Sequence, residues 1–249
     1  DGIHIFDLAK TKEGLEAASE FIKTTAGQKG KILFVGTKRQ AQDIVKQTAI
    51  GLGMPYLVTR WIGGLITNWD YVYKRIEHLR DLKAGVAENR FKDLTKKERI
   101  LIDREIVKME KDFGGIEDLR EIPTAVFVAD ARKDASAIKE AYLRGVKVIA
   151  IVDTNADPDL VDYIIPANDD AARSVQLIMD IVAEAVEEGV KNKNVGANHD
   201  SPNEKEVRSG KSEAGKEVGS GKVEIADKVK RQKPKVKSKK KPVVIPSEK

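Results

Sequence analysis

ILFVGTKR, residues 32–39, joins a short and wholly apolar run to a glycine turn and to the start of an amphipathic stretch. Three further runs have the same apolar character: residues 125–129 (AVFVA), 148–152 (VIAIV) and 163–165 (YII). None of them alternates apolar with polar residues, which is typical of parallel strands that helices cover on both faces. Residues 3–6 (IHIF) are a weaker candidate for a further strand. The runs predict a parallel sheet between two layers of helices.

The segments between the runs have apolar residues at helical spacing. Their apolar faces are made of Leu15, Ala18, Ile22 and Thr25, of Ala41, Ile44, Val45, Thr48 and Leu52, and of Ala171, Val175, Ile178, Val182 and Ala185. A shorter helix is predicted to follow Asp134 as its N-cap and to end at Gly145. Because strands and helices alternate, the sequence predicts a doubly wound α/β domain over residues 1–66 and 114–190.

Residues 67–113 interrupt this alternation with two amphipathic stretches and no strand signal. The seam of the first contains Trp69, Val72, Ile76, Leu79 and Val86, with Lys83 in one seam position, and the seam of the second contains Ile102, Ile106, Met109 and Phe113. Thr67 and Asp70 are predicted to cap the first helix, and Gly114 to end the second. These short heptad seams predict an antiparallel coiled-coil hairpin inserted into the α/β domain.

The composition excludes several classes of protein. The chain has 249 residues and no cysteine, which excludes disulfides, thiolate metal sites and a cysteine nucleophile. It contains no run of about 18 apolar residues, so we expect no membrane-spanning segment. The histidines His4, His78 and His199 fall in separate segments without a Ser or Asp at motif spacing, so no nucleophilic triad is expected.

Residues 191–249 differ in composition from the rest of the chain. They hold 17 basic and 8 acidic side chains and no Leu, Phe, Tyr, Trp or Met, which predicts a disordered Lys-rich tail. Residues 228–241 contain nine basic side chains and no acid. Such a block serves either as a solubilising tail or as an electrostatic arm for RNA. The remaining residues, 1–190, hold 28 basic and 32 acidic side chains, so the basic character of the chain belongs to the tail.

A doubly wound sheet directs attention to the carboxyl ends of its strands, where such folds bind ligands. Residues 36–39 (GTKR) follow a strand and open a helix, but no G-x-G-x-x-G after a strand and no P-loop motif occurs. We therefore expect a capping turn there and no bound nucleotide. Asp130 and Asp153 each end a strand, and a single acid per strand without a second beside it predicts no metal site.

The predicted hairpin carries an excess of positive charge, with 12 basic and 9 acidic side chains in residues 72–113. The basic residues that we expect toward its tip are Lys74, Arg75, Arg80, Lys83, Arg90, Lys92, Lys96, Lys97 and Arg99. Two interpretations fit such a surface: a solvated exterior stabilised by i,i+4 ion pairs, or a contact with a phosphate backbone. The local excess at the tip favours the phosphate contact.

The stretch RWIGGLITN, residues 60–68, resembles the R-W-x-G-G-x-x-T-N signature of the bacterial small-subunit ribosomal proteins numbered two. Further stretches match that family in the same order: residues 34–41, 53–56, 94–98, 113–116, 151–158 and 165–171. The resemblance covers about residues 3–189. Family members begin with a longer segment rich in His, Arg and Trp that includes RNA contacts, so we expect this chain to be a fragment.

The resemblance implies a flavodoxin-like sheet with an inserted coiled-coil hairpin. It implies a structural, non-catalytic constituent of the cytoplasmic ribosome that binds small-subunit ribosomal RNA and neighbouring proteins, among them the largest, mRNA-binding one. No cofactor, metal, membrane or small-molecule substrate is implied. To the hairpin residues we add Lys38, Arg39 and Arg60 as expected phosphate contacts, and Trp61 as either a stacking platform for RNA or a packing anchor.

Two other functions remain open from the residues alone. A phosphate-ligand enzyme or a receiver-like regulator could use the same fold, and magnesium-dependent binding of a nucleotide or an acyl phosphate would support it. A free adaptor protein could use the hairpin to bind partners. Co-sedimentation with small ribosomal subunits would support the ribosomal interpretation.

Overall fold

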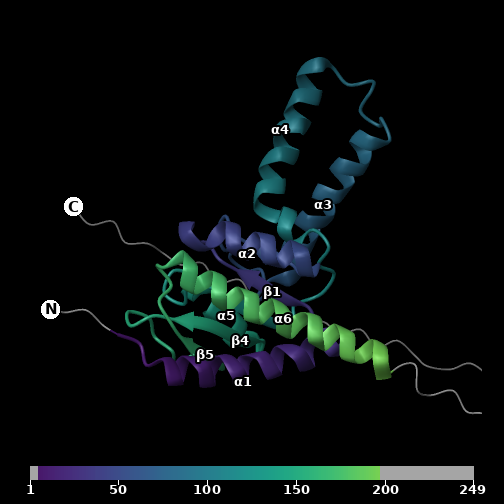
Figure 1. Cartoon of the computed structure of the whole chain (residues 1–249). Helices are drawn as coiled ribbons and strands as arrows, with labels where there is room; N and C mark the ends of the chain where they lie inside the picture. Colours follow the sequence, from purple (N-terminus) through teal and green to yellow (C-terminus); the bar gives the residue numbers. More distant parts are fainter. Residues whose placement is uncertain (1–4, 197–249) are drawn as a thin grey trace, which may run out of the picture. The chain divides into compact units, whose positions relative to one another are not determined.

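The computed structural model describes residues 5–196, and a five-stranded parallel sheet forms the centre of this part (Figure 1). In spatial order the strands are β2 (Tyr56–Leu57), β1 (Ile32–Val35), β3 (Ala125–Val128), β4 (Lys147–Val152) and β5 (Tyr163–Pro166). The order 2-1-3-4-5 is that of flavodoxin-like, doubly wound sheets. The predicted fold class of the core is confirmed, and each of the four main apolar runs forms a strand.

Helices cover both faces of the sheet, because successive residues of a strand point to opposite sides. Ile32 and Phe34 pack in a cluster with α1 (Leu8–Gly27), α2 (Arg39–Leu52) and α6 (Ala172–Gly196). Leu33 and Val35 pack in a second cluster with α5 (Ala135–Arg144) and the loop of residues 58–68. All four strand residues are fully buried, which explains why this strand shows no alternation in sequence.

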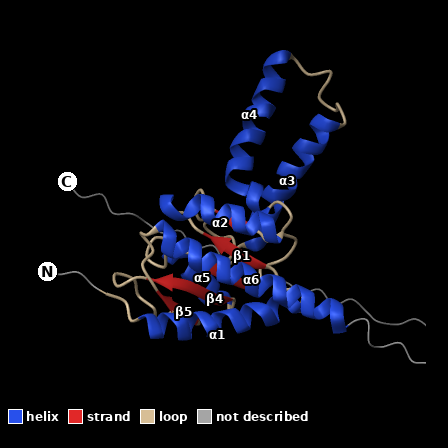
Figure 2. Ribbon diagram, viewed as in Figure 1, coloured by secondary structure: helices blue, strands red, loops and turns tan. Residues whose placement is uncertain are grey.

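Between β2 and β3 the chain forms α3 (Trp69–Ala87) and α4 (Lys96–Phe113), followed by the 3-10 turn η1 (Gly114–Ile116). The two long helices contact each other and extend away from the sheet, and residues 88–95 join their far ends (Figure 2). Of the residues of α4, Met109 and Phe113 are buried, and both lie in its last two turns. The apolar packing that α4 contributes is therefore concentrated next to the sheet.

The predicted seam of the first hairpin helix is wrong at its distal end. Leu82 and Gly85 are buried in α3, whereas the Lys83 side chain is 31% exposed and Val86 is 45% exposed. From Ile76 onward the buried positions advance in steps of three rather than in the three–four alternation of a heptad. The hairpin nevertheless has the two helices that the periodicity predicted.

Two of the predicted caps are wrong and two predicted helix ends are confirmed. Asn68 precedes α3 without a side-chain cap, and the Thr67 hydroxyl donates to Glu140 instead. Asp134 precedes α5 as predicted, but its carboxylate accepts hydrogen bonds from Thr37 rather than capping the helix. The helix α5 ends at Gly145, whose φ of +69° favours glycine, and α4 ends at Gly114.

The two ends of the described chain correct two further predictions. Residues 5–6 are irregular rather than a strand, because α1 begins right after them, where the Asp7 carboxylate caps its first turn; residues 3–4 lie outside the described part. The helix α6 continues through residues 191–196, assigned above to the tail, and Lys191 pairs there with Glu187 one turn earlier. The rest of the predicted tail lies outside the described residues. No helix within residues 5–196 is long and apolar enough to cross a membrane.

Candidate nucleic-acid interface

The turn after β1 occupies the place where a doubly wound fold would hold a phosphate, and an internal carboxylate fills it. The Thr37 hydroxyl donates to Asp134 Oδ1 at 2.8 Å, and the Thr37 backbone N–H donates to Asp134 Oδ2 at 3.2 Å. Asp134 is 2% exposed, and burial raises the pKa of its carboxyl group despite these bonds. An anion from solvent would have to compete with a carboxylate that the fold already holds against this turn.

Lys38 is bound within the protein rather than presented to a partner. Its ammonium nitrogen lies 2.6 Å from Asp169 Oδ1, 2.7 Å from Asp170 Oδ1 and 3.3 Å from Asp130 Oδ2. Burial lowers the pKa of Lys38, but the hydrogen bonds that its ammonium group donates to Asp169 and Asp170 outweigh burial and raise the pKa above the usual range. The structure thus gives Lys38 a role in holding the ends of β3 and the loop before α6 together.

The acids at this edge are closer together than the sequence suggested. Carboxylate oxygens of Asp153, Asp169 and Asp170 lie within 4.8 Å of one another. The expectation that each strand-end acid stands alone is wrong, because the loop after β5 brings Asp169 and Asp170 beside Asp153. Burial raises the pKa of Asp169, and Lys38 supplies the positive charge that offsets the cluster.

The loop of residues 60–68 is held by one carboxylate from α5. Glu140 Oε1 accepts from Trp61 Nε1 at 3.0 Å and from the backbone N–H of Gly64 at 2.8 Å. Glu140 Oε2 accepts from the N–H groups of Ile66 and Thr67 and from the Thr67 hydroxyl, at 3.0–3.3 Å. Burial by itself would raise the pKa of Glu140, but these hydrogen bonds outweigh it and lower the pKa.

This arrangement explains why the loop contains Trp, Gly and Thr at fixed spacing. Gly64 has a φ of +85°, which glycine adopts at little conformational cost, and the turn that it makes lies among the N–H groups that donate to Glu140. Trp61 packs against the apolar cluster and donates its indole N–H inward, so the structure supports the packing-anchor interpretation. Sequence reasoning missed Glu140; its position between Ala137 and Ala141 on the buried face of α5 was the available signal.

Arg60 ties the same loop to the last turn of α4. Its Nε and Nη2 atoms donate to the two oxygens of Asp112 at 3.2 and 2.7 Å, and the Thr59 hydroxyl donates to the carbonyl of Lys111. The hydrogen bonds from Arg60 lower the pKa of Asp112. The Arg60 side chain is 65% exposed, but two of its nitrogens are already bound to the two oxygens of Asp112, so its charge is paired within the protein.

Three cations of the hairpin are likewise engaged within the protein. Arg80 donates to the carbonyl oxygens of Glu117 and Leu119 beyond η1. Lys83 lies 2.9 Å from Glu110 and 2.7 Å from Glu117, and Arg90 pairs with Asp81 and Glu88 at 2.8 and 3.1 Å. The contacts of Arg80 and Lys83 join α3 to α4 and to the loop that leads to β3, and those of Arg90 hold the loop of residues 88–95 against the end of α3.

The remaining expected cations are exposed. Across residues 5–196 no hydrogen bond or ion pair engages the side chains of Arg39, Lys74, Arg75, Lys92, Lys96, Lys97 and Arg99. Four of these seven lie at the far end of the hairpin, in the connecting loop and the first turn of α4. There the Thr95 hydroxyl and Glu98 form a capping box that fixes how the helix begins.

The hairpin also holds cations that the sequence analysis did not single out. A hollow of about 350 Å³ lies between α3 and α4 near the sheet, and Arg75, Arg104 and Lys108 line it together with Asp112. Arg104 and Lys108 are four residues apart on α4, which places them on one helix face. That spacing was the signal available in the sequence. The exposed cations of the hairpin therefore include one group at its far end and a second group that lines this hollow.

Comparison with known proteins gives one consistent result. The family model of ribosomal protein S2 matches residues 1–189. The small ribosomal subunit protein uS2 of Mycobacterium sp. (strain KMS) is 44% identical over 202 residues, which cover 81% of this chain and 71% of that protein. The uS2 protein of Nocardia farcinica is 47% identical over 190 residues, 76% of this chain and 67% of that protein. The uS2 protein of Bifidobacterium longum (strain NCC 2705) is 46% identical over 191 residues.

Proposed function

Since this chain belongs to the ribosomal protein S2 family, we propose that it is a structural constituent of the small ribosomal subunit, where it binds ribosomal RNA and neighbouring proteins. The family is structural rather than enzymatic, and the chain is therefore not an enzyme. One observation carries the assignment of an RNA surface. Lys38 in the strand-end crevice is neutralised within the protein, whereas Lys92, Lys96, Lys97 and Arg99 at the hairpin's far end are exposed and have no ion-pair partner within residues 5–196.

The proposed RNA surface consists of the exposed cations of the hairpin. Lys92, Lys96, Lys97 and Arg99 form its distal group, and Arg75, Arg104 and Lys108 form its proximal group, with Lys74 and Arg39 as single additions. Cations that release condensed counterions on binding phosphates provide affinity without reading sequence. Lys38, Arg60, Trp61, Arg80, Lys83 and Arg90 act instead by holding the protein in shape.

The residue divisions expected from sequence complete the proposal. Residues 67–113 act as a coiled-coil hairpin inserted between the two parts of the α/β domain, residues 1–66 and 114–190. The Lys-rich tail adds electrostatic affinity. Among neighbouring proteins, the largest, mRNA-binding small-subunit protein is a proposed partner, and the cytoplasmic ribosome is the proposed location. The family resemblance supports the hairpin, the partner and the location, whereas the role of the tail rests on its charge, because a long Lys-rich tail is not a fixed feature of the family.

The alternative of a phosphate-ligand enzyme or receiver-like regulator has no comparable support. Such a protein would need a vacant turn after β1 to hold a phosphate, and acids at the strand ends that are free to bind a metal or a phosphoryl group. In this structure the Asp134 carboxylate occupies the turn, and the Lys38 ammonium group neutralises the charge of Asp169 and Asp170. The crevice therefore follows from the fold and gives no support for a catalytic function, because a fold by itself does not imply a function.

Sedimentation tests the proposal directly. The full chain is mixed with small subunits that lack this protein and is run through a sucrose gradient containing high magnesium. We expect the protein to move with the subunits and to be released at high salt, because phosphate contacts weaken as salt rises. Protein that stays at the top of the gradient at low salt would contradict the proposal. Bovine serum albumin, which is acidic, serves as the control for trapping.

A further inference from the structure

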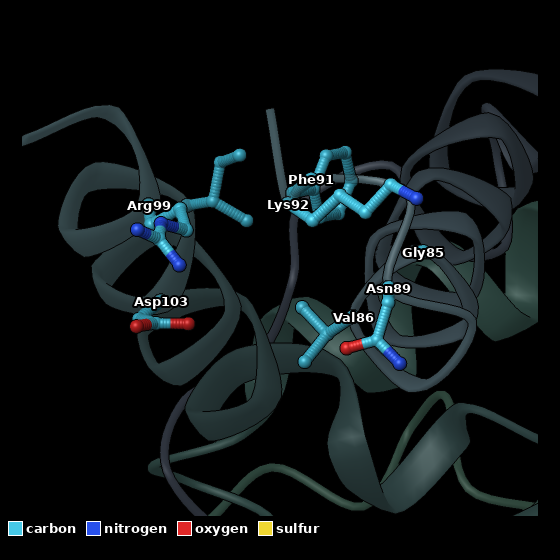
Figure 3. Close-up of a pocket in the computed structure, with 8 residues that line it drawn as sticks. Gly85, Val86, Asn89, Phe91, Lys92, Arg99 and Asp103 are labelled. Carbon is cyan, nitrogen blue, oxygen red and sulfur yellow. The ribbon is translucent and has the colours of Figure 1, made fainter. Parts of the chain in front are cut away.

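A small hollow at the far end of the hairpin combines a partly buried aromatic ring, apolar side chains, an amide, a carboxylate and two cations. It lies where the end of α3, the connecting loop and the second turn of α4 meet, and its volume is about 160 Å³. Figure 3 shows Arg99 and Asp103 on one side of the hollow and Val86, Asn89, Phe91 and Lys92 on the other. The space between these side chains is open.

The walls of this hollow suit a flat aromatic ligand. Val86, Phe91 and Ile102 provide apolar surface, and Phe91 and Ile102 are only partly buried. A Cβ built on Gly85 would lie 2.6 Å from Cε2 and Cζ of Phe91, so the ring rests directly on the backbone of α3. Only glycine at this position leaves room for the Phe91 ring to pack there. A cavity of about 150 Å³ is known to admit benzene, so this hollow has room for one ring system and not for a whole nucleotide.

The polar groups of the hollow suit the edge of a nucleobase. The Asn89 amide offers a donor and an acceptor, and the Asp103 carboxylate offers acceptors for an exocyclic amino group or ring N–H. Asn89 has a φ of +54°, a conformation that asparagine tolerates better than most residues. Lys92 and Arg99 also line the hollow and are exposed, so they can contact the phosphates on either side of an inserted base.

We infer that this hollow binds a single unpaired nucleobase of RNA, which stacks on Phe91 while its sugar and phosphates remain outside. The inference rests on the proposed function, because the cations around the hollow draw in the backbone that carries the base. RNA is read mainly through bulged or looped bases that stack on aromatic side chains. The proximal hollow between α3 and α4 lacks this feature, since the only aromatic residue in its lining, Phe113, is 7% exposed.

The occupant can be identified by ultraviolet cross-linking of the full chain bound to small-subunit ribosomal RNA, followed by mass spectrometry of the peptide adducts. We expect the peptide that contains Phe91 to carry one nucleotide. The variant Val86→Phe fills the hollow without removing any polar contact. We expect it to lose the cross-link and to bind the RNA about 5- to 150-fold more weakly, the range for a lost base stack. Its salt dependence should be unchanged, since no phosphate contact is lost.

The matched control is Val107→Phe, the same change at an exposed valine of α4 outside the hollow, which should bind as the unmodified chain does. A second test replaces the cross-linked nucleotide by an abasic one. This RNA should bind the unmodified chain as weakly as the intact RNA binds Val86→Phe, and combining both changes should cost nothing further. Such non-additivity identifies the base as the occupant.

Two results would overturn this inference while leaving the proposed function intact. In the first, Val86→Phe and the abasic RNA both bind with full affinity. In the second, Val86→Phe binds RNA normally but fails to join small subunits, which would mean that the hollow receives a side chain of a neighbouring protein. If the unmodified chain bound no ribosomal RNA at all, the proposed function itself would fail and this inference with it.

Discussion

The strand-end crevice and the far end of the hairpin both contain lysine and arginine, but they differ in what those cations meet. In the crevice, Lys38 is surrounded by three carboxylates, and the neighbouring turn is closed by Asp134. At the end of the hairpin, Lys96 and Lys97 are exposed at the start of a helix. Cationic residues therefore indicate a nucleic-acid surface only where the fold has not already neutralised them.

The largest effect is expected from reversing the distal group of charges. Changing Lys92, Lys96, Lys97 and Arg99 to Glu together removes up to four phosphate contacts, and each should reduce the salt slope of log affinity by about 0.7–0.9. Affinity for small-subunit ribosomal RNA at 0.1 M salt should fall by roughly a thousandfold on that basis. Filter binding across a salt series measures both quantities.

The α/β domain should remain folded in this variant, because none of the four side chains is buried. The same reversal at Lys10 and Lys12, which lie on α1, is the matched control and should change the slope far less. An unchanged slope in the four-site variant would make the far end of the hairpin a protein contact rather than an RNA contact.

A smaller effect, on stability, is expected at Glu140. The change Glu140→Ala leaves three backbone N–H groups, the Trp61 indole and the Thr67 hydroxyl without their acceptor. The free energy of unfolding should fall by about 3 kcal/mol, which urea denaturation of the full chain can measure. Glu140→Gln keeps one acceptor oxygen and should cost less. A loss below about 1 kcal/mol for the alanine variant would show that water replaces the carboxylate.

A still smaller effect concerns the Arg60–Asp112 pair. Because Arg60 lowers the pKa of Asp112 in the folded state, the pair stabilises the protein above the ordinary carboxyl pKa of about 3.9 and less at lower pH. The Arg60 side chain is 65% exposed, so solvent screens the pair and its contribution should be about 0.5 kcal/mol. Urea denaturation of Arg60→Ala should show that deficit at pH 6 and little of it at pH 3. A deficit that is equal at both values would contradict an electrostatic role.

No effect at all is expected when nucleotides are added. Titration calorimetry of the chain with ATP, GTP and NAD should detect no binding tighter than about 100 μM, or about −5.5 kcal/mol. Nucleotides should not bind because the Asp134 carboxylate already occupies the turn after β1, where a phosphate would have to lie. Tighter binding would support the alternative of a phosphate-ligand enzyme. It would also contradict the conclusion that the strand-end crevice, unlike the far end of the hairpin, is closed to phosphates.

The sheet could be predicted because its four main strands are continuous apolar runs, of which β1, β3 and β4 are buried on both faces. The edge strand β5 is buried only at Ile165, with Ile164 37% exposed, but its apolar residues were enough to indicate a strand. The strand β2 could not, since two residues carry no periodicity, and Tyr56–Leu57 is a strand only because β1 lies beside it. The true start of α3 was also hidden, because Glu140, more than 70 residues away, engages the expected cap Thr67.

The candidate site was less predictable than the fold. Lys38 and Arg39 are adjacent and similar in type, yet one is surrounded by acids and the other is exposed at the start of α2. What separates them is the loop after β5, more than 120 residues farther along the chain, which delivers Asp169 and Asp170. Local sequence contains the cations but not their partners, so it overestimates the number that are available to RNA.

The Glu140 contacts also impose an order on the synthesis of this protein. Trp61 leaves the translating ribosome 79 residues before Glu140 does, so the 60–68 loop emerges without its acceptor. At the usual speed of about 5–20 residues per second, the delay is roughly 4 to 16 s. Asp112 emerges 52 residues after Arg60 and 28 residues before Glu140, so the Arg60–Asp112 pair can close while the 60–68 loop still lacks Glu140. Nascent-chain protection should therefore appear first between the loop and α4, and later at Trp61.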